Sequence, residues 1–173
     1  MIEFRFLVGQ FFYAVASAAV IGTAVASASQ TFIDFIGIPA WATEINISMT
    51  GGSLNASDYF LVQLGDSGGI ETSGYSGSYE QVDGGGNALS NGFREVSGVT
   101  ADNKTGCYVL RLVDRANNTW MCSAIIARTA GGAADMYVIA GSKSLTDTLT
   151  QVRLTTGTGT STMDAGSFNF SYK

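Results

Sequence analysis

Apolar and polar residues alternate along most of the chain from residue 30 onward, and this period of two predicts β-strands. Between residues 32 and 36, Ile33 and Phe35 are expected on one face and their neighbours on the other. Residues 44–49 alternate in the same way, which indicates a half-buried strand. Residues 58–64 are apolar on both faces and therefore predict a central strand.

The second half of the chain has the same character. Residues 107–113 and 119–127 predict a hairpin, because residues 114–118 between them are good turn formers. Further strands are predicted at 136–140, 148–155 and 166–172, with a turn at 157–160. No segment after residue 30 has the pattern of an amphipathic helix. About eight short strands separated by turns predict an all-β fold, a β-sandwich of jelly-roll-like type over residues 30–173.

A glycine- and serine-rich region at residues 65–91 is expected to form exposed loops with short strand fragments. It begins with Gly65 to Gly69, whose letters GDSGG match the nucleophile loop of trypsin-like serine proteases. That chemistry needs an imidazole base to activate the serine, and the chain contains no histidine. The match is therefore interpreted as a tight glycine-rich turn after a strand.

The two cysteines, Cys107 and Cys122, fall on the two strands of the predicted hairpin. A turn at 114–118 would place Cys122 opposite about Arg111, which is roughly 13 Å along the strand from Cys107. A disulfide does not span that separation, so free thiols are expected. Two isolated cysteines without histidine also give no zinc-site spacing, and no metal or cofactor is expected.

Residues 1–29 differ from the rest of the chain and are assigned to a separate N-terminal arm. After Glu3 and Arg5 the sequence is uncharged through residue 28 and rich in aromatic and small apolar residues. A secretory signal peptide and a membrane helix both fit this composition, although the leader lacks a Lys/Arg cluster. The preferred interpretation is an extended or partly helical arm covered by partner chains, since exposed apolar surface of this size would aggregate. Its candidate assembly residues are Phe6, Phe11, Phe12 and Tyr13.

Composition narrows the function further. At 173 residues the chain is long enough for one domain with its own core. The net charge of −5 and the scattered basic residues argue against a nucleic-acid partner. Low charge together with abundant Gly, Ser and Thr is typical of a chain that buries its surface in sheets or in partners.

The glycine-rich region also holds the candidate contact residues. Asp66 and Glu71 are loop carboxylates of the kind that catalyse glycoside hydrolysis, but any soluble acidic loop has this pattern. Tyr75 and Tyr79 could stack on sugar rings, or they could hold the loop in place. We predict a receptor-contact loop formed by Tyr75, Tyr79, Asp66 and Glu71, and no catalytic residue.

Several segments, in order along the chain, resemble a family of tailed-bacteriophage virion proteins with a C-terminal β-rich module. They are residues 32–41 (FIDFIGIPAW), 62–75 (VQLGDSGGIETSGY), 140–145 (AGSKSL), 152–156 (VRLTT) and 164–170 (DAGSFNF). The resemblance implies a fibre-like or surface protein of the virion, commonly trimeric, and names no reaction. Family members often carry the module at the end of a longer fibre, whereas an apolar arm precedes it here.

The expected function is a phage virion structural protein on the particle surface, held by its arm to sister chains and to capsid or tail proteins. As a short fibre or spike it would project outward and bind host surface glycans through residues 65–91. The alternative is a capsid decoration protein that stabilises the head. A secreted carbohydrate-active enzyme is a third hypothesis, and processing after Ala26 or Ala28 would support it.

Overall fold

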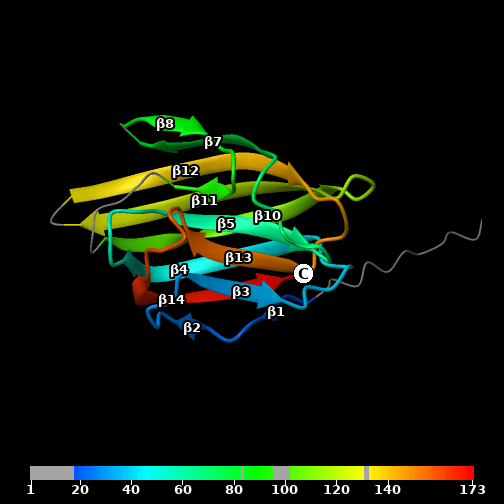
Figure 1. Cartoon of the computed structure of the whole chain (residues 1–173), viewed down its shortest axis with the longest axis horizontal. Helices are drawn as coiled ribbons and strands as arrows, with labels where there is room; N and C mark the ends of the chain where they lie inside the picture. Colours follow the sequence, from blue (N-terminus) through cyan, green and yellow to red (C-terminus); the bar gives the residue numbers. More distant parts are fainter. Residues whose placement is uncertain (1–17, 83, 96–101, 131–132) are drawn as a thin grey trace, which may run out of the picture.

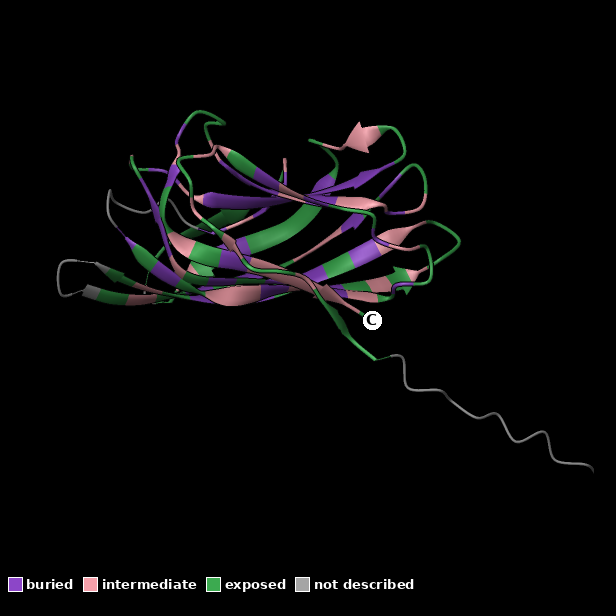
Figure 2. Ribbon diagram, turned by 90° about the horizontal axis from the view of Figure 1, so that it is seen from below, coloured by how far each residue is buried: buried purple, intermediate pink, exposed green. Residues whose placement is uncertain are grey.

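The computed structural model describes residues 18–82, 84–95, 102–130 and 133–173, and these residues form strands and no helix (Figure 1). The strands make two antiparallel sheets, one of nine strands and one of five. The all-β prediction is therefore confirmed. The cause is the period-two pattern, because buried and exposed residues alternate along most of the long strands (Figure 2).

The larger sheet contains the long strands of the chain. Its order is β1 (Val20–Ile21), β14 (Met163–Tyr172), β4 (Glu44–Leu54), β10 (Asn103–Asp114), β11 (Thr119–Ala130), β12 (Ala133–Ser144), β7 (Tyr75–Gln81) and β8 (Gly86–Ala88), with β2 (Val25–Ala26) also paired to β14. Three strands that are consecutive in sequence, β10, β11 and β12, therefore lie side by side in its middle.

The smaller sheet has the order β3 (Phe32–Ile36), β13 (Gln151–Thr156), β5 (Phe60–Asp66) and β6 (Gly69–Ile70), with β9 (Phe93–Arg94) paired to β5. Every residue of β5 is buried, as its two-sided apolar sequence predicts. In β3, Ile33 and Phe35 are buried and their neighbours are not, which confirms the predicted alternation.

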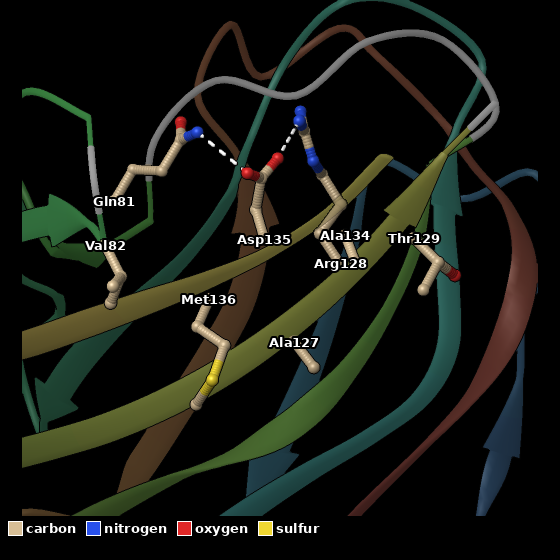
Figure 3. A pocket seen from close by; sticks show the side chains of 8 residues that line it. All are labelled: Gln81, Val82, Ala127, Arg128, Thr129, Ala134, Asp135 and Met136. Atoms are coloured by element: carbon tan, nitrogen blue, oxygen red, sulfur yellow. Dashed lines mark hydrogen bonds and ion pairs between the residues drawn. The ribbon is translucent and has the colours of Figure 1, made fainter. Parts of the chain in front are cut away.

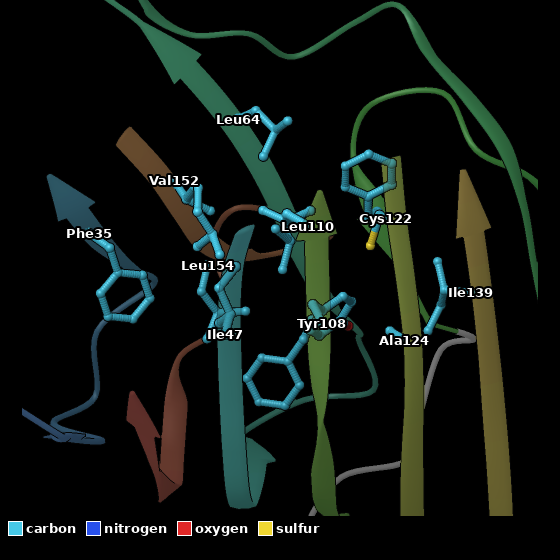
Figure 4. Close-up of a cluster of buried hydrophobic side chains, with 14 of the residues drawn as sticks. Phe35, Ile47, Leu64, Tyr108, Leu110, Cys122, Ala124, Ile139, Val152 and Leu154 are labelled. Carbon is cyan, nitrogen blue, oxygen red and sulfur yellow. The ribbon is translucent and has the colours of Figure 1, made fainter. Parts of the chain in front are cut away.

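One hydrophobic core joins the two sheets (Figure 4). Ile47, Leu110 and Ile139 reach it from the larger sheet. Leu64 and Val152 reach it from the smaller sheet. Because each sheet buries one face against the other, each also has an outer face, and the outer faces are where partners can bind.

The hairpin of β10 and β11 forms at residues 114–119 as predicted, with a register one residue from the expected one. Cys122 lies opposite Leu110, whereas Arg111 lies opposite Met121. A one-residue step moves a side chain to the other face of a sheet. Cys122 is accordingly buried in the core, Cys107 is partly exposed, and both thiols are free.

Residues 65–91 are more ordered than the sequence predicted. Strand β7 extends over seven residues and pairs with β12 in the larger sheet, so this part is not an exposed loop with strand fragments. Gly77 makes the pairing possible. It has a φ of +131°, and a Cβ there would lie 2.2 Å from the carbonyl oxygen of Ala140.

The described part of the N-terminal segment lies along the edge of the larger sheet. Val20 pairs with Tyr172 and Val25 with Phe168, so residues assigned to the arm belong to the sheet (Figure 1). The candidate assembly residues Phe6, Phe11, Phe12 and Tyr13 lie outside the described residues. Their role stays a prediction.

Candidate functional site

Asp66, the first predicted contact residue, stands where β5 turns into β6. Its side chain is only 3% exposed and accepts hydrogen bonds from the hydroxyl of Thr146 at 2.8 Å, the amide of Gly68 at 2.8 Å and the amide of Asp147 at 2.9 Å. These bonds, that from Thr146 first, hold the pKa of Asp66 below its usual value. The carboxylate therefore fastens the β5–β6 turn to the segment that follows β12 and is not free for a ligand.

Glu71 is engaged in a similar way. It pairs with Lys143 of β12, and its Oε1 accepts the amide of Thr146 at 3.0 Å. Ser67, the residue in the nucleophile position of the protease-like run, is exposed and bonds to Asp147 at 3.1 Å. The structure thus brings Asp66 and Glu71 together, as the sequence suggested, but their bonds are internal to the fold.

Tyr75 and Tyr79 are buried, with 5% and 7% of their surfaces exposed. The hydroxyl oxygen of Tyr75 accepts the amide of Leu64 at 2.7 Å, and its ring meets Phe93 edge to face at 5.1 Å between centroids. Burial raises the pKa of Tyr75, so its hydroxyl stays protonated. The prediction that these rings are exposed for a receptor was wrong, because both belong to β7 and face the core.

A polar hollow of about 290 Å³ lies on the outer side of the smaller sheet. Its lining is Leu61, Gln63, Thr72, Asn91, Thr155, Thr156, Gly157, Thr158 and Gly159. Gln63 donates to the carbonyl of Asn91 at 2.8 Å, which holds the 91–92 turn over the sheet. The lining consists of hydroxyls, amides and a single aliphatic side chain, with no ionisable group. Such a surface suits a neutral, hydroxyl-rich ligand.

The larger sheet presents the opposite chemistry on its outer side. Ile125, Met121, Met136 and Val138 are 57%, 51%, 48% and 45% exposed. The register places Ile125 between Cys107 on β10 and Val138 on β12. We call this surface the outer apolar face and define it as Cys107, Val109, Met121, Ile125, Met136, Val138 and Ala140.

The sequence carried a signal for this face that was missed. From Trp120 to Ile126 the chain is apolar at nearly every position, so both faces of β11 are apolar. One face fills the core, and the other lies on the outside of the sheet. A strand apolar on both faces is typical of a position buried on both sides, and here no described residue covers the second face.

A charged group lies at one end of the larger sheet, on its core-facing side. Arg128 of β11 pairs with Asp135 of β12, and Gln81 donates to the same carboxylate at 3.0 Å (Figure 3). These side chains line a hollow of about 450 Å³ together with the apolar Val82 and Met136. The group therefore lies on the opposite side of the strands from Met136 and the outer apolar face.

Behind this group lies a buried ion pair. Nζ of Lys104 is 2.6 Å from Oε1 of Glu95, and the two side chains are 1% and 0% exposed. Burial raises the pKa of Glu95 even though Lys104 is beside it. A carboxyl group with a raised pKa is a candidate general acid, but at 0% exposure no substrate reaches it. The pair is best explained as part of the fold.

Two further observations concern the described ranges alone. They contain no group of three or more His, Cys, Asp or Glu side chains that could hold a metal ion. They also contain no helix with the length and apolarity needed to cross a membrane.

No protein-family model, no curated protein and no solved structure matches the chain.

Proposed function

We propose that the protein is a structural component of a tailed-phage virion, a short fibre or spike module that assembles with copies of itself, as a homotrimer, and with other virion proteins. The observation that carries this proposal is the outer apolar face. A sheet face with isoleucine, valine and methionine about half exposed is typical of a surface that a partner covers. The resemblance of residues 32–41, 62–75, 140–145, 152–156 and 164–170 to phage surface proteins supports the virion as the place of assembly.

The finer architecture belongs to this proposal. We describe the two sheets with their shared core as a β-sandwich. The chain passes repeatedly from one sheet to the other, at β2–β3, β3–β4, β4–β5, β6–β7, β8–β9, β9–β10, β12–β13 and β13–β14, which favours jelly-roll-like connections. The β10–β11–β12 meander is a departure from that plan, and it is the part that supplies the outer apolar face.

The engagement of the acidic residues favours a non-enzymatic role. Asp66 and Glu71 use their carboxylates to fasten loops, and Glu95 is enclosed with Lys104. A glycosidase needs two carboxyl groups that flank an open substrate cleft. These three carboxylates lack that arrangement, so their geometry gives the secreted-enzyme hypothesis no support.

Binding of a host glycan, if the module is a fibre, is assigned to the polar hollow of the smaller sheet in place of Tyr75 and Tyr79. The test is adsorption of particles to host cells with Thr72→Trp, which fills the hollow from an exposed position. Ala116→Trp, at an exposed position of the β10–β11 turn, is the matched control. Equal adsorption by both variants and the parent would remove the hollow from the proposal.

The capsid decoration role remains the second candidate, because an outer apolar face can cover a capsid lattice as well as a sister chain. Electron microscopy of particles with an antibody or small tag on the protein separates the two roles. A few copies at a vertex or at the tail support a fibre. Labelling over the whole head supports decoration. Purified particles without label would refute the virion proposal altogether.

A further inference from the structure

The residues around the outer apolar face, like those in its centre, have the composition of a binding surface. The neighbouring strands carry small polar side chains on the same side of the sheet: Ser48 and Thr50 on β4, and Ser76 and Ser78 on β7, all exposed. An apolar centre with a polar rim is the usual composition of a protein–protein interface. We therefore expect a protein segment of similar width to bind this face.

The centre of the face is hollowed and not flat. Small side chains at Ser123 and Ala140 lie between the larger Val109, Ile125 and Val138, and the resulting depression has a volume of about 420 Å³. Cys107 stands at its rim, on β10. A depression of this shape accepts projecting side chains, and aromatic rings are the largest apolar ones available.

Two occupants can be compared. The same face of a second copy would make a two-fold contact in which hollow meets hollow, and the depression would stay unfilled. Residues 1–17, outside the described part, contain large aromatic residues instead. They include Phe4, Phe6, Phe11, Phe12 and Tyr13 and carry no charge after Arg5. The apolar arm therefore complements the hollow, and a second copy of the face does not.

The direction of the chain at the start of the described residues indicates whether the arm binds the face of its own copy or that of a neighbouring copy. Strand β1 runs antiparallel to β14 with Val20 opposite Tyr172, so the chain leading back from Val20 passes the carboxyl end of β14. Ala18 and Ala19 are exposed, and the described N-terminal end of the chain leads away from both sheets (Figure 2). An arm returning to its own face would have to reverse and cross β14 and β4, about 15 Å of sheet. Seventeen residues can span up to about 56 Å, so a neighbouring copy is within reach without that reversal.

We propose that residues 1–17 of one copy pack on the outer apolar face of a neighbouring copy, with aromatic side chains in the hollow beside Cys107. This inference deepens the proposed function and rests on it, since it names the surface through which copies assemble. The exchange is directional, from arm to face, so it is compatible with a closed ring of copies such as the proposed trimer.

The native thiol of Cys107 allows a direct test. In full-length protein, Ala14→Cys or Gln10→Cys places a second reactive thiol in the arm, while Cys122, 1% exposed, does not compete. A short bismaleimide is then added, and the product is separated on a denaturing gel. We expect chains linked to one another. Linkage within one chain, or no linkage from either position, would overturn the proposal.

A matched control moves the acceptor thiol. Cys107→Ser combined with Thr72→Cys moves the thiol from the outer apolar face to the hollow on the smaller sheet, and linkage to the arm should fall at least fivefold. Equal linkage from both positions would mean that the arm has no preferred surface, and would overturn the proposal as well.

A second measurement needs no new cysteine. Deletion of residues 1–17 should raise the rate of Cys107 alkylation about tenfold and reduce the mass in light scattering to that of one chain. Unchanged alkylation and an unchanged oligomer would show that another surface holds the copies together. The particle-labelling experiment tests the proposed function independently. If particles are labelled but the arm does not cross-link to Cys107, the virion role stands and the arm-to-face contact is refuted.

Discussion

The buried pair of Lys104 and Glu95 gives the sharpest test of how the fold is held together. The perturbation is Lys104→Met, which removes the positive charge and keeps an unbranched side chain. In the parent, Oε1 of Glu95 accepts a hydrogen bond from Nζ of Lys104 at 2.6 Å and another from the amide of Phe60 at 2.9 Å. Its other oxygen, Oε2, has no hydrogen-bond partner among the described residues. The substitution therefore leaves a carboxyl group with 0% exposure and one remaining donor.

The expected cost follows from this geometry. Removing one partner of a buried ion pair typically costs about 3–5 kcal/mol, because the remaining charge is neither solvated nor paired. A surface pair is the comparison. Arg111 lies 3.1 Å from Glu44 but is 64% exposed, and Arg111→Met should cost about 0–1 kcal/mol. Urea unfolding of both variants, followed by tryptophan fluorescence, measures the difference.

A double variant tests the mechanism. Glu95→Gln in the Lys104→Met background removes the stranded charge and keeps an oxygen to accept the amide of Phe60. Most of the lost free energy of unfolding should return. A Lys104→Met cost below about 1 kcal/mol, or a double variant no more stable than the single one, would refute the reasoning that charge burial governs this region.

The pH dependence of the single variant has a defined sign. The pKa of Glu95 is already raised by burial in the parent, and loss of Lys104 raises it further. A group with a raised folded-state pKa contributes stability below its unfolded pKa and loses that contribution as pH rises through the folded value. The stability gap between Lys104→Met and the parent should therefore narrow as pH falls from 8 to 5. A constant gap would contradict this assignment.

Three further outcomes are expected. Tyr75→Phe should cost about 1–3 kcal/mol because it leaves a buried amide of β5 without an acceptor, whereas Tyr79→Phe should change the unfolding midpoint little. Asp66→Asn should destabilise at pH 7, and the difference in stability from the parent should shrink as pH falls below about 3.8. The reason is that the folded-state pKa of Asp66 lies below its unfolded value of about 3.8, so the carboxylate stabilises the fold above that pH. This stabilisation is lost as pH falls through the folded-state pKa, and acid titration of both proteins checks it. Gly77→Ala should lower thermal stability strongly, since its Cβ meets the backbone of β12. Gly85→Ala, with open space around it, should not, and equal melting temperatures for the two would contradict the close approach of β7 and β12.

Local pattern accounts for the predictions that the structure confirms. The alternation at Ile33 and Phe35, the two-sided apolar run before Asp66 and the turn formers at 114–118 each determine burial or direction over a few residues. The absence of an amphipathic helical pattern after residue 30 likewise led to the correct fold class. These features depend on neighbouring residues alone, so a single sequence contains them.

The positions that were wrong depend on contacts distant in sequence. Tyr75 and Tyr79 read as loop residues because glycines and serines surround them, and only pairing of β7 with β12 about 60 residues later turns both rings into the core. Asp66 looked like an exposed ligand until Thr146 and Asp147 reached it across the fold. Composition does not encode such partners.

What the sequence by itself determined is therefore the all-β class, the free thiols, the unsuitability of the protease-like run and an apolar segment at residues 1–29 that differs from the body. The tertiary structure decided which apolar positions fill the core and which, like Ile125 and Val138, stay outside. The physical reason is that a strand apolar on both faces specifies two buried surfaces. Only the stacking of the two sheets shows which of them a single chain covers.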